Sequence, residues 1–137
     1  MSTLAEQIDR ALTDGKLRAD AAENIRKTLA GAESEFAGRV LGELIDANEW
    51  EELNDRFYKT LAFGTGGLRG RTIGKVATQQ QSVGTPNALG RPEFPCVGTN
   101  AMNYFNVARA TRGLVSYVQK WRSKKARHWP VENCHRT

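Results

Sequence analysis

Apolar residues recur at helical spacing through the first 62 residues, and this pattern constrains the fold more than any other feature. Thr3 and Glu6 have the spacing of a capping box at the start of the first stretch, and Asp14 and Gly15 end it. The apolar residues of the four successive stretches are Leu4, Ile8 and Leu12; Ala21, Ile25 and Leu29; Phe36, Val40, Leu41, Leu44 and Ile45; and Trp50, Leu53, Phe57 and Leu61. The spacing predicts four amphipathic helices whose apolar stripes are packing surfaces and whose acidic residues form a solvated face.

Charge divides the chain into two chemically different halves. Residues 1–62 hold 13 acids and 8 bases, a net charge of −5, whereas residues 63–137 hold 2 acids and 12 bases, a net charge of +10. The strongly basic second half favours an anionic partner. Charge alone does not decide whether this partner is a nucleic acid, a membrane surface or a phosphorylated metabolite. The sequence shows no apolar run typical of a signal peptide or of a membrane span. We therefore expect a cytoplasmic protein.

The segment Phe63–Gly70 reads FGTGGLRG, with four glycines around one threonine and one arginine. Glycine serves where the backbone turns sharply or where a ligand approaches it closely, so this segment could hold a phosphate group. The standard nucleotide motifs do not fit, because Arg69 stands where the dinucleotide pattern needs a glycine and no Gly-Lys-Ser/Thr follows. On spacing alone, a glycine-rich turn without a ligand fits these residues equally well.

A long polar connection follows and leads into another helix. Residues 76–98 mix Gln, Gly and Pro without a regular apolar period, which predicts an exposed loop. Beyond it we expect a helix over residues 103–120, with Asn100 or Asn103 available as its N-cap. Its apolar stripe consists of Val107, Ala110, Leu114 and Val118.

FGTGGLRG followed by NAMNYFNVARATRGLVSYV (residues 100–118) resembles the opening of the alpha-D-phosphohexomutase superfamily, which includes phosphoglucomutases, phosphomannomutases and phosphopentomutases. The resemblance covers about residues 61–119. In that family the first motif closes an early strand at the edge of the active-site cleft, and the second opens the first helix of an α/β/α domain. The resemblance therefore implies the α/β class, with a helical extension over residues 1–62 and an incomplete phosphohexomutase domain I over residues 63–120.

The resemblance also implies a function in carbohydrate metabolism. Family members are isomerases that move a phosphoryl group within a hexose or pentose phosphate, by way of a phosphoserine, a bisphosphorylated intermediate and Mg²⁺. By match to the motif, Arg69 is the candidate catalytic residue, because an arginine beside the reacting phosphate stabilises its charge. The alternative for Arg69 is a surface ion pair. The candidate residues of the substrate and phosphate cleft are Thr65, Gly66, Gly67 and Gly70.

Two parts of the family's machinery have no counterpart in this sequence. The family's phosphoserine stands in a Thr-Ala-Ser-His-Asn-Pro loop, which surrounds none of the serines here: Ser2, Ser34, Ser82, Ser116 and Ser123. Mg²⁺ is held by an Asp-Gly-Asp-Gly-Asp run, but the last aspartate here is Asp55, and only Glu93 and Glu132 follow it as acids. We therefore expect a mutase fragment that binds no Mg²⁺ and is inactive alone, with a sugar phosphate as the substrate of the full-length enzyme.

The C-terminal sequence differs from the family pattern. Relatives enter an apolar strand after the first helix, whereas residues 121–137 form a basic tail, which we interpret as disordered or out of frame. We expect neither a membrane nor a nucleic acid as partner. The competing interpretation is a small basic anion- or nucleic-acid-binding module, in which Trp121 and Trp129 of the tail stack on bases. The remaining candidate metal ligands lack the paired spacing of a metal site: Cys96, Cys134, His128 and His135.

Overall fold

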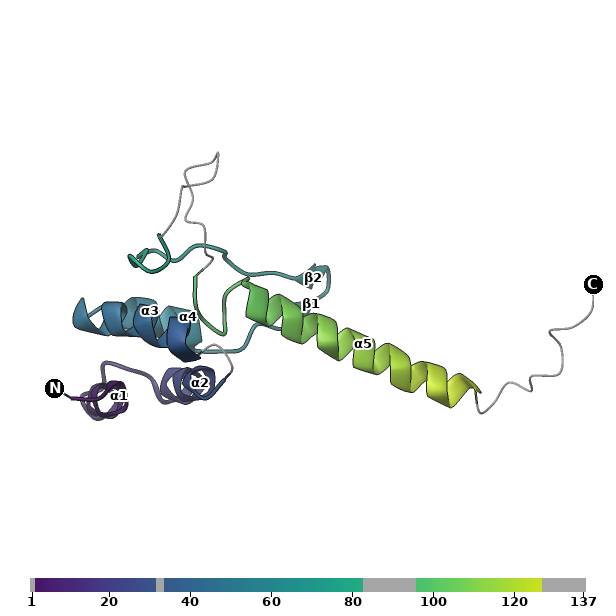
Figure 1. Cartoon of the computed structure of the whole chain (residues 1–137), viewed down its shortest axis with the longest axis horizontal. Coiled ribbons are helices and arrows are strands. Elements are labelled where there is room, and N and C mark those ends of the chain that lie inside the picture. The colour runs from purple at the N-terminus through teal and green to yellow at the C-terminus, as the bar shows by residue number, and fades with distance from the viewer. Residues whose placement is uncertain (1, 32–33, 83–95, 127–137) are drawn as a thin grey trace, which may run out of the picture. The chain divides into compact units, whose positions relative to one another are not determined.

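The computed structural model describes residues 2–31, 34–82 and 96–126 (Figure 1). Over these residues the chain is of the mixed α/β class, with five helices and a two-stranded antiparallel sheet. The elements are α1 (Leu4–Thr13), α2 (Ala19–Leu29), α3 (Ser34–Asp46), α4 (Trp50–Phe57), β1 (Phe63–Gly64), β2 (Gly67–Leu68) and α5 (Tyr104–Ala126). The chain divides into two compact units, Met1–Asn106 and Val107–Thr137.

Local sequence signals account for where the first helices begin and end. The predicted capping box is confirmed, since the Glu6 amide donates to the Thr3 hydroxyl at 3.3 Å and the Thr3 amide donates to the Glu6 carboxylate at 3.0 Å. Gly15 reverses the chain after α1 with a φ of +71°, and Asn48 does so after α3 with a φ of +57°. α2 has no side-chain cap of its own, but the Asn54 side chain of α4 accepts a hydrogen bond from the Arg18 amide at 2.8 Å.

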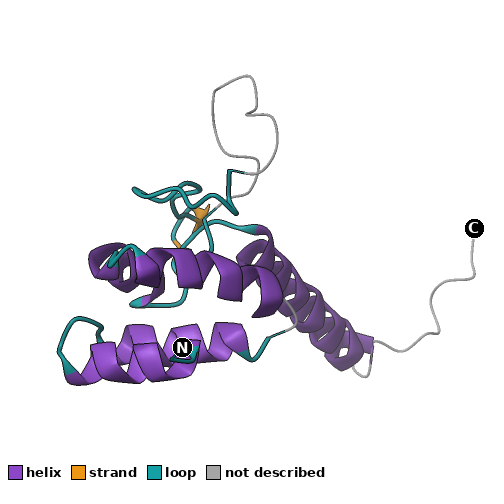
Figure 2. Ribbon diagram, turned by 60° about the vertical axis from the view of Figure 1, so that its left-hand side comes forward, coloured by secondary structure: helices purple, strands orange, loops and turns teal. Residues whose placement is uncertain are grey.

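The first four helices share one apolar core, so their apolar stripes are packing surfaces, as the sequence predicted. α2 contacts α1, α3 and α4, and α3 contacts α1 and α4 (Figure 2). The apolar spacing places one stripe of each helix in this core, which excludes water from the side chains that line it. Its buried members are Ile8, Ala11, Leu17, Ala21, Ala22, Ile25, Ala37, Val40, Leu41, Leu44, Ile45, Leu53, Phe57 and Val97.

The fourth helix is shorter than its apolar stripe predicted. α4 ends at Phe57, whose carbonyl accepts a hydrogen bond from the Asn24 side chain at 2.7 Å. Leu61 is buried but lies beyond the end of the helix, and its amide donates to the Thr99 carbonyl at 2.7 Å. Backbone pairing with a segment far along the sequence therefore replaces the last turn that the spacing predicted.

The predicted loop over residues 76–98 has no helix or strand in its described part, but the predicted exposure is wrong at five positions, and residues 83–95 lie outside the described residues. Buried residues of this segment are Thr78, Gln81, Cys96, Val97 and Gly98. Asn103 and Asn106 hold the end of the loop, since the Asn103 side chain donates to the carbonyls of Cys96 and Gly98, and the Asn106 side chain donates to those of Gly98, Thr99 and Ala101. Side-chain amides thus satisfy backbone groups that a buried loop cannot pair by itself.

The last helix is longer than the sequence predicted. Asn103 caps α5, as expected, by accepting a hydrogen bond from the Asn106 amide at 3.0 Å. α5 continues to Ala126, so residues 121–126 of the basic tail are helical, because they include good helix formers and neither glycine nor proline. The rest of the tail lies outside the described residues, with His128, Trp129, Cys134 and His135. No helix in the described part is long and apolar enough to cross a membrane.

Candidate functional site

The FGTGGLRG segment forms a tight antiparallel hairpin. Phe63 pairs with Leu68 and Gly64 pairs with Gly67, which leaves Thr65 and Gly66 as a two-residue turn. Gly67 has a φ of +111°, a conformation that side chains with a Cβ rarely adopt. The glycine content therefore has a local structural cause at this position, in agreement with the turn that the composition indicated.

Arg69 lies against the glycine turn. A Cβ added at Gly66 would come within 2.5 Å of Nη2 of Arg69, so the guanidinium occupies the space that any larger residue at position 66 would need. Arg69, Thr65 and Gly66 are all exposed. An exposed guanidinium over a turn can bind a phosphate through charge-assisted, paired N–H···O hydrogen bonds.

Gly70 has a different role from the other glycines of the segment. A Cβ at this position would come within 2.9 Å of Cδ1 of Leu61 and 3.2 Å of the Met102 amide. Gly70 therefore lets the chain leave the hairpin in close contact with two distant segments. The five predicted site residues are thus neighbours in one hairpin and its exit, and their role at a phosphate stays a prediction.

The hairpin is attached to the helical core through Arg71, two residues beyond Arg69. Nη2 of Arg71 lies 2.6 Å from Oδ2 of Asp55 and 3.4 Å from both carboxylate oxygens of Glu52. The Arg71 carbonyl also accepts a hydrogen bond from the Met102 amide at 2.9 Å. Two acids of α4 therefore fix the backbone that follows the candidate phosphate-binding arginine.

A buried ion pair at the centre of this attachment was not foreseen from the sequence. Nε of Arg56 donates to Oε1 of Glu52 at 2.7 Å, and both side chains are almost completely buried. Arg56 also donates to the Gln81 side chain at 3.3 Å and to the Val76 carbonyl at 2.5 Å. The expectation that the acids of the helices form a solvated face is therefore wrong for Glu52, because its carboxylate is the acceptor that makes burial of Arg56 possible.

Two glycines let the chain pack directly on this ion pair. A Cβ at Gly74 would come within 2.1 Å of Nη2 of Arg56 and 2.3 Å of Oε1 of Glu52. A Cβ at Gly98 would come within 2.7 Å of the Arg56 carbonyl oxygen. The segments before residue 82 and after residue 96 thus both meet α4 at Arg56.

Cys96 is a buried free thiol beside the same network. Burial raises the pKa of the Cys96 thiol, and the nearby guanidinium groups of Arg56 and Arg71 offset only part of this effect. The thiol is therefore protonated and a poor nucleophile at neutral pH. This agrees with the interpretation of Cys96 as an ordinary thiol, while Cys134 lies outside the described residues.

The described residues hold no group of three or more His, Cys, Asp or Glu side chains that could bind a metal ion. The acids nearest the hairpin, Glu52 and Asp55, form ion pairs with arginines and do not fit a Mg²⁺ site.

Comparisons with known proteins add no functional information, since no family model, curated protein or solved structure matches the chain.

Proposed function

We propose that this chain is the N-terminal part of a phosphosugar mutase of the phosphoglucomutase and phosphomannomutase type. The full-length enzyme would transfer a phosphoryl group within a hexose or pentose phosphate. In this proposal residues 1–62 are a helical extension and the glycine hairpin begins domain I of the phosphohexomutase fold. The observation that carries the proposal is the exposed Arg69 guanidinium, which lies over the Gly66 turn.

The contribution of Arg69 follows from the charge of a transferring phosphoryl group. Negative charge spreads over three phosphoryl oxygens during transfer, so a fixed guanidinium stabilises it through hydrogen bonds that need no rearrangement. The absence of a side chain at Gly66 leaves room for this guanidinium, and the exposed Thr65 hydroxyl lies in the same turn. Attachment of Arg71 to Asp55 and Glu52 limits how far the hairpin can move.

The chain alone lacks the other groups that this reaction needs. Mg²⁺ in the family supplies further charge stabilisation, but no described residues here fit it, and no serine here stands in the family's phosphoserine loop. The proposal therefore assigns to this chain a share of the substrate phosphate site and no complete catalytic centre.

A binding experiment tests the proposed phosphate site. We expect glucose 1-phosphate, titrated into the ¹⁵N-labelled chain, to shift the amide signals of residues 65–70 at millimolar concentration, whereas glucose leaves them unchanged. Arg69→Ala should weaken this binding about tenfold or more, because it removes a charge-assisted hydrogen-bonding group. Arg10→Ala is the matched control, since Arg10 is exposed on α1. Equal binding by the Arg69→Ala variant would refute the assigned role.

An activity assay tests the expectation that the chain is inactive alone. We expect no conversion of glucose 1-phosphate above background in the presence of Mg²⁺ and a bisphosphate activator. Turnover by the purified chain that disappears in the Arg69→Ala variant would show a complete active site and contradict the fragment proposal.

A further inference from the structure

Arg69 and Arg71 lie close together in the sequence but have different surroundings. Residues 56–92 contain no acid, so a carboxylate that pairs with either arginine must come from another part of the chain. Asp55 and Glu52 of α4 pair with Arg71, whose side chain is 27% exposed. Among the described residues, no carboxylate lies within 4.0 Å of the exposed Arg69 guanidinium. Arg69 is therefore open to an anionic ligand, whereas Arg71 is held by acids of a helix.

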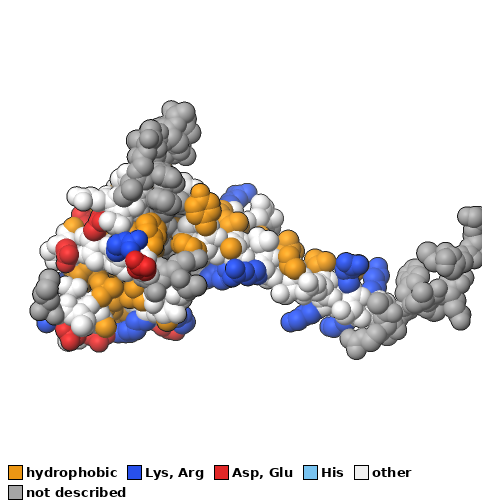
Figure 3. Space-filling model, viewed as in Figure 1, with side chains coloured by type: hydrophobic (Ala, Val, Ile, Leu, Met, Phe, Trp, Pro, Cys, Tyr) orange, Lys and Arg blue, Asp and Glu red, His pale blue; other side chains and the backbone are white. Residues whose placement is uncertain are grey.

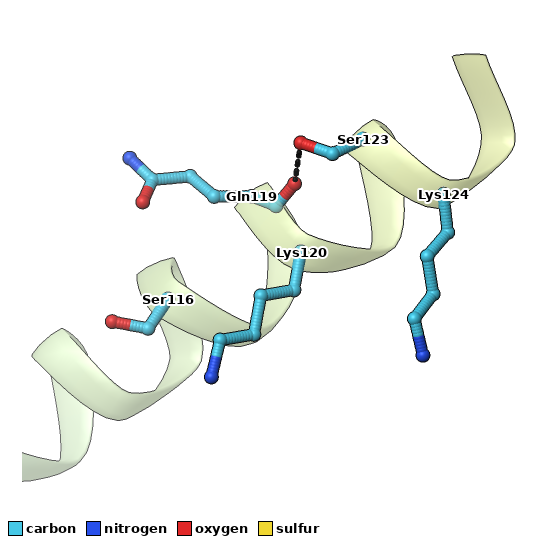
Figure 4. A pocket seen from close by; sticks show the side chains of 5 residues that line it. All are labelled: Ser116, Gln119, Lys120, Ser123 and Lys124. Carbon is cyan, nitrogen blue, oxygen red and sulfur yellow. Dashed lines mark hydrogen bonds between the residues drawn. The ribbon is translucent and has the colours of Figure 1, made fainter. Parts of the chain in front are cut away.

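The second unit carries a cationic hollow that is less suited to hold a phosphate. The hollow is open, has a volume of about 360 Å³ and is lined by Ser116, Gln119, Lys120, Ser123 and Lys124 (Figure 4). All five residues belong to α5, which contains no acid that could fix the two ammonium groups in place. Figure 3 shows acidic and basic side chains side by side on the first unit, and basic ones without acidic neighbours along α5. Cations held by acids are therefore a feature of the first unit.

Asp55 is the acid that holds Arg71 most closely. Its Oδ2 atom lies 2.6 Å from Nη2 of Arg71, whereas both carboxylate oxygens of Glu52 lie 3.4 Å from that atom. Oε1 of Glu52 already accepts hydrogen bonds from Nε of Arg56 at 2.7 Å and from the Lys75 amide at 3.1 Å. Glu52 therefore cannot take over the place of Asp55 without weakening the buried ion pair.

Residues 99–102 join α4 to both ends of the hairpin. The Asn100 side chain donates to the Asp55 carbonyl at 3.1 Å. The Leu61 amide, before the hairpin, donates to the first residue of this segment at 2.7 Å, and the Arg71 carbonyl, after the hairpin, accepts from its last residue at 2.9 Å. Asp55 thus contacts the hairpin exit through its side chain and the joining segment through its backbone.

We infer that Asp55 is a positioning residue of the proposed phosphate site, so that the helical extension contributes to that site. Its carboxylate holds the Arg71 guanidinium, which fixes the backbone two residues after Arg69 and keeps the Arg69 guanidinium over the glycine turn. An arginine that is already held in place binds a phosphate more tightly than a mobile one, because less conformational freedom is lost on binding. The inference rests on the proposed function, since it concerns the affinity of the same site.

Two physical effects predict opposite changes in affinity when the Asp55 carboxylate is removed. A negative charge near the site repels a phosphate, so electrostatics alone predicts tighter binding by an Asp55→Ala variant. Loss of the contact with Arg71 gives the hairpin more freedom, which predicts weaker binding. We expect the second effect to be larger, because the Asp55 side chain is 42% exposed and water and salt screen its charge.

A titration of the ¹⁵N-labelled chain with glucose 1-phosphate tests the inference. Asp55→Ala should weaken binding about fivefold or more. It should also lower the ¹H–¹⁵N NOE of the amides of residues 67–70 in the ligand-free chain, because the hairpin exit is released. Asp9→Ala is the matched control, since it removes an exposed carboxylate that pairs with Arg26 of a neighbouring helix. This control should leave the NOE values unchanged and the affinity within about twofold of the parent chain. Amide signals of α2 and α3 report that both variants are folded.

A double-mutant cycle separates positioning from a general loss of structure. Because Asp55 acts through Arg69, Asp55→Ala should change the affinity less than about twofold when residue 69 is already alanine. Equal or tighter binding by the Asp55→Ala variant, unchanged NOE values, or additive losses in the double variant would overturn the inference and leave the proposed function in place. An absence of binding by the parent chain would overturn both.

Discussion

Arg56 is the residue on which the packing of the first unit depends most directly. Its side chain bonds Glu52, Gln81 and the Val76 carbonyl, and its own carbonyl accepts a hydrogen bond from the Asn100 amide at 2.9 Å. A buried guanidinium is tolerated only when its donors are satisfied and its charge is balanced. Substitutions next to this side chain should therefore lower the free energy of unfolding more than substitutions of similar size elsewhere.

Gly98→Ala should destabilise the first unit. Its Cβ would meet the Arg56 carbonyl oxygen, which belongs to the backbone of α4 and cannot move aside freely, so we expect a loss of about 1–3 kcal/mol. Gly42→Ala is the control, since nothing lies within 4 Å of a Cβ there and alanine favours the helix by about 0.5–1 kcal/mol. Chemical denaturation measures both. A Gly98→Ala variant as stable as the parent chain would contradict the close packing at Arg56.

Glu52→Gln should also destabilise the fold. The substitution leaves Arg56 buried without a balancing charge, which costs about 3 kcal/mol in comparable pairs. Glu51→Gln changes the neighbouring, exposed carboxylate and should alter the unfolding free energy by less than about 0.5 kcal/mol. Equal effects of the two substitutions on the urea midpoint would refute the buried ion pair.

Residue-level signals in the sequence predicted the helix caps but not the buried ion pair. Each cap hydrogen bond joins residues three positions apart, as Thr3 and Glu6 show at α1 and Asn103 shows at α5. The spacing in the sequence was therefore enough to predict these caps. Glu52 and Arg56 are four residues apart, the same spacing as in an exposed surface pair such as Glu35 and Arg39. Only the covering segments, which come from distant parts of the sequence, distinguish the two cases.

At the scale of elements, periodicity was informative where packing is local. It located α1 to α4. It also extended the fourth helix to Leu61, because a periodic pattern carries no information on the backbone hydrogen bond between Leu61 and Thr99. The hairpin of the candidate site could be foreseen as a turn, because four glycines in eight residues favour one. Its attachment through Arg71 could not, because the acids that bind it lie in α4.

Hydrogen exchange should separate α5 from the bundle. Buried residues of α2 to α4, such as Ile25, Leu41 and Leu53, should have amides that exchange at least roughly 100-fold more slowly than those of residues 114–121. The reason is that every residue from 111 to 125 is exposed, so only local helix formation protects α5. Uniformly strong protection in a monomer would contradict this expectation.

At the scale of the whole molecule, the two units should differ in their dependence on each other. The first unit contains α1 to α4, the hairpin and the buried network, whereas the second consists in its described part of the exposed helix. A chain that ends at residue 110 should therefore unfold cooperatively, with a free energy within about 0.5 kcal/mol of the full chain, because residues 111–125, the removed residues whose burial is described, are all exposed. A loss of cooperative thermal unfolding in this shorter chain would show that the second unit contributes to the core.

The placement of Arg56 also has a consequence for how the protein is made. The Gln81 side chain that bonds the Arg56 guanidinium follows it by 25 residues, so at about 5–20 residues per second the ribosome adds this partner about 1–5 s later. Isolated helices form in well under a millisecond, so α4 would be complete long before its covering segments exist. During that interval the guanidinium of Arg56 is still hydrated on an open side of the nascent bundle. The guanidinium of Arg56 therefore loses its water only after Val76 and Gln81 have been made, which places its burial after the formation of α4.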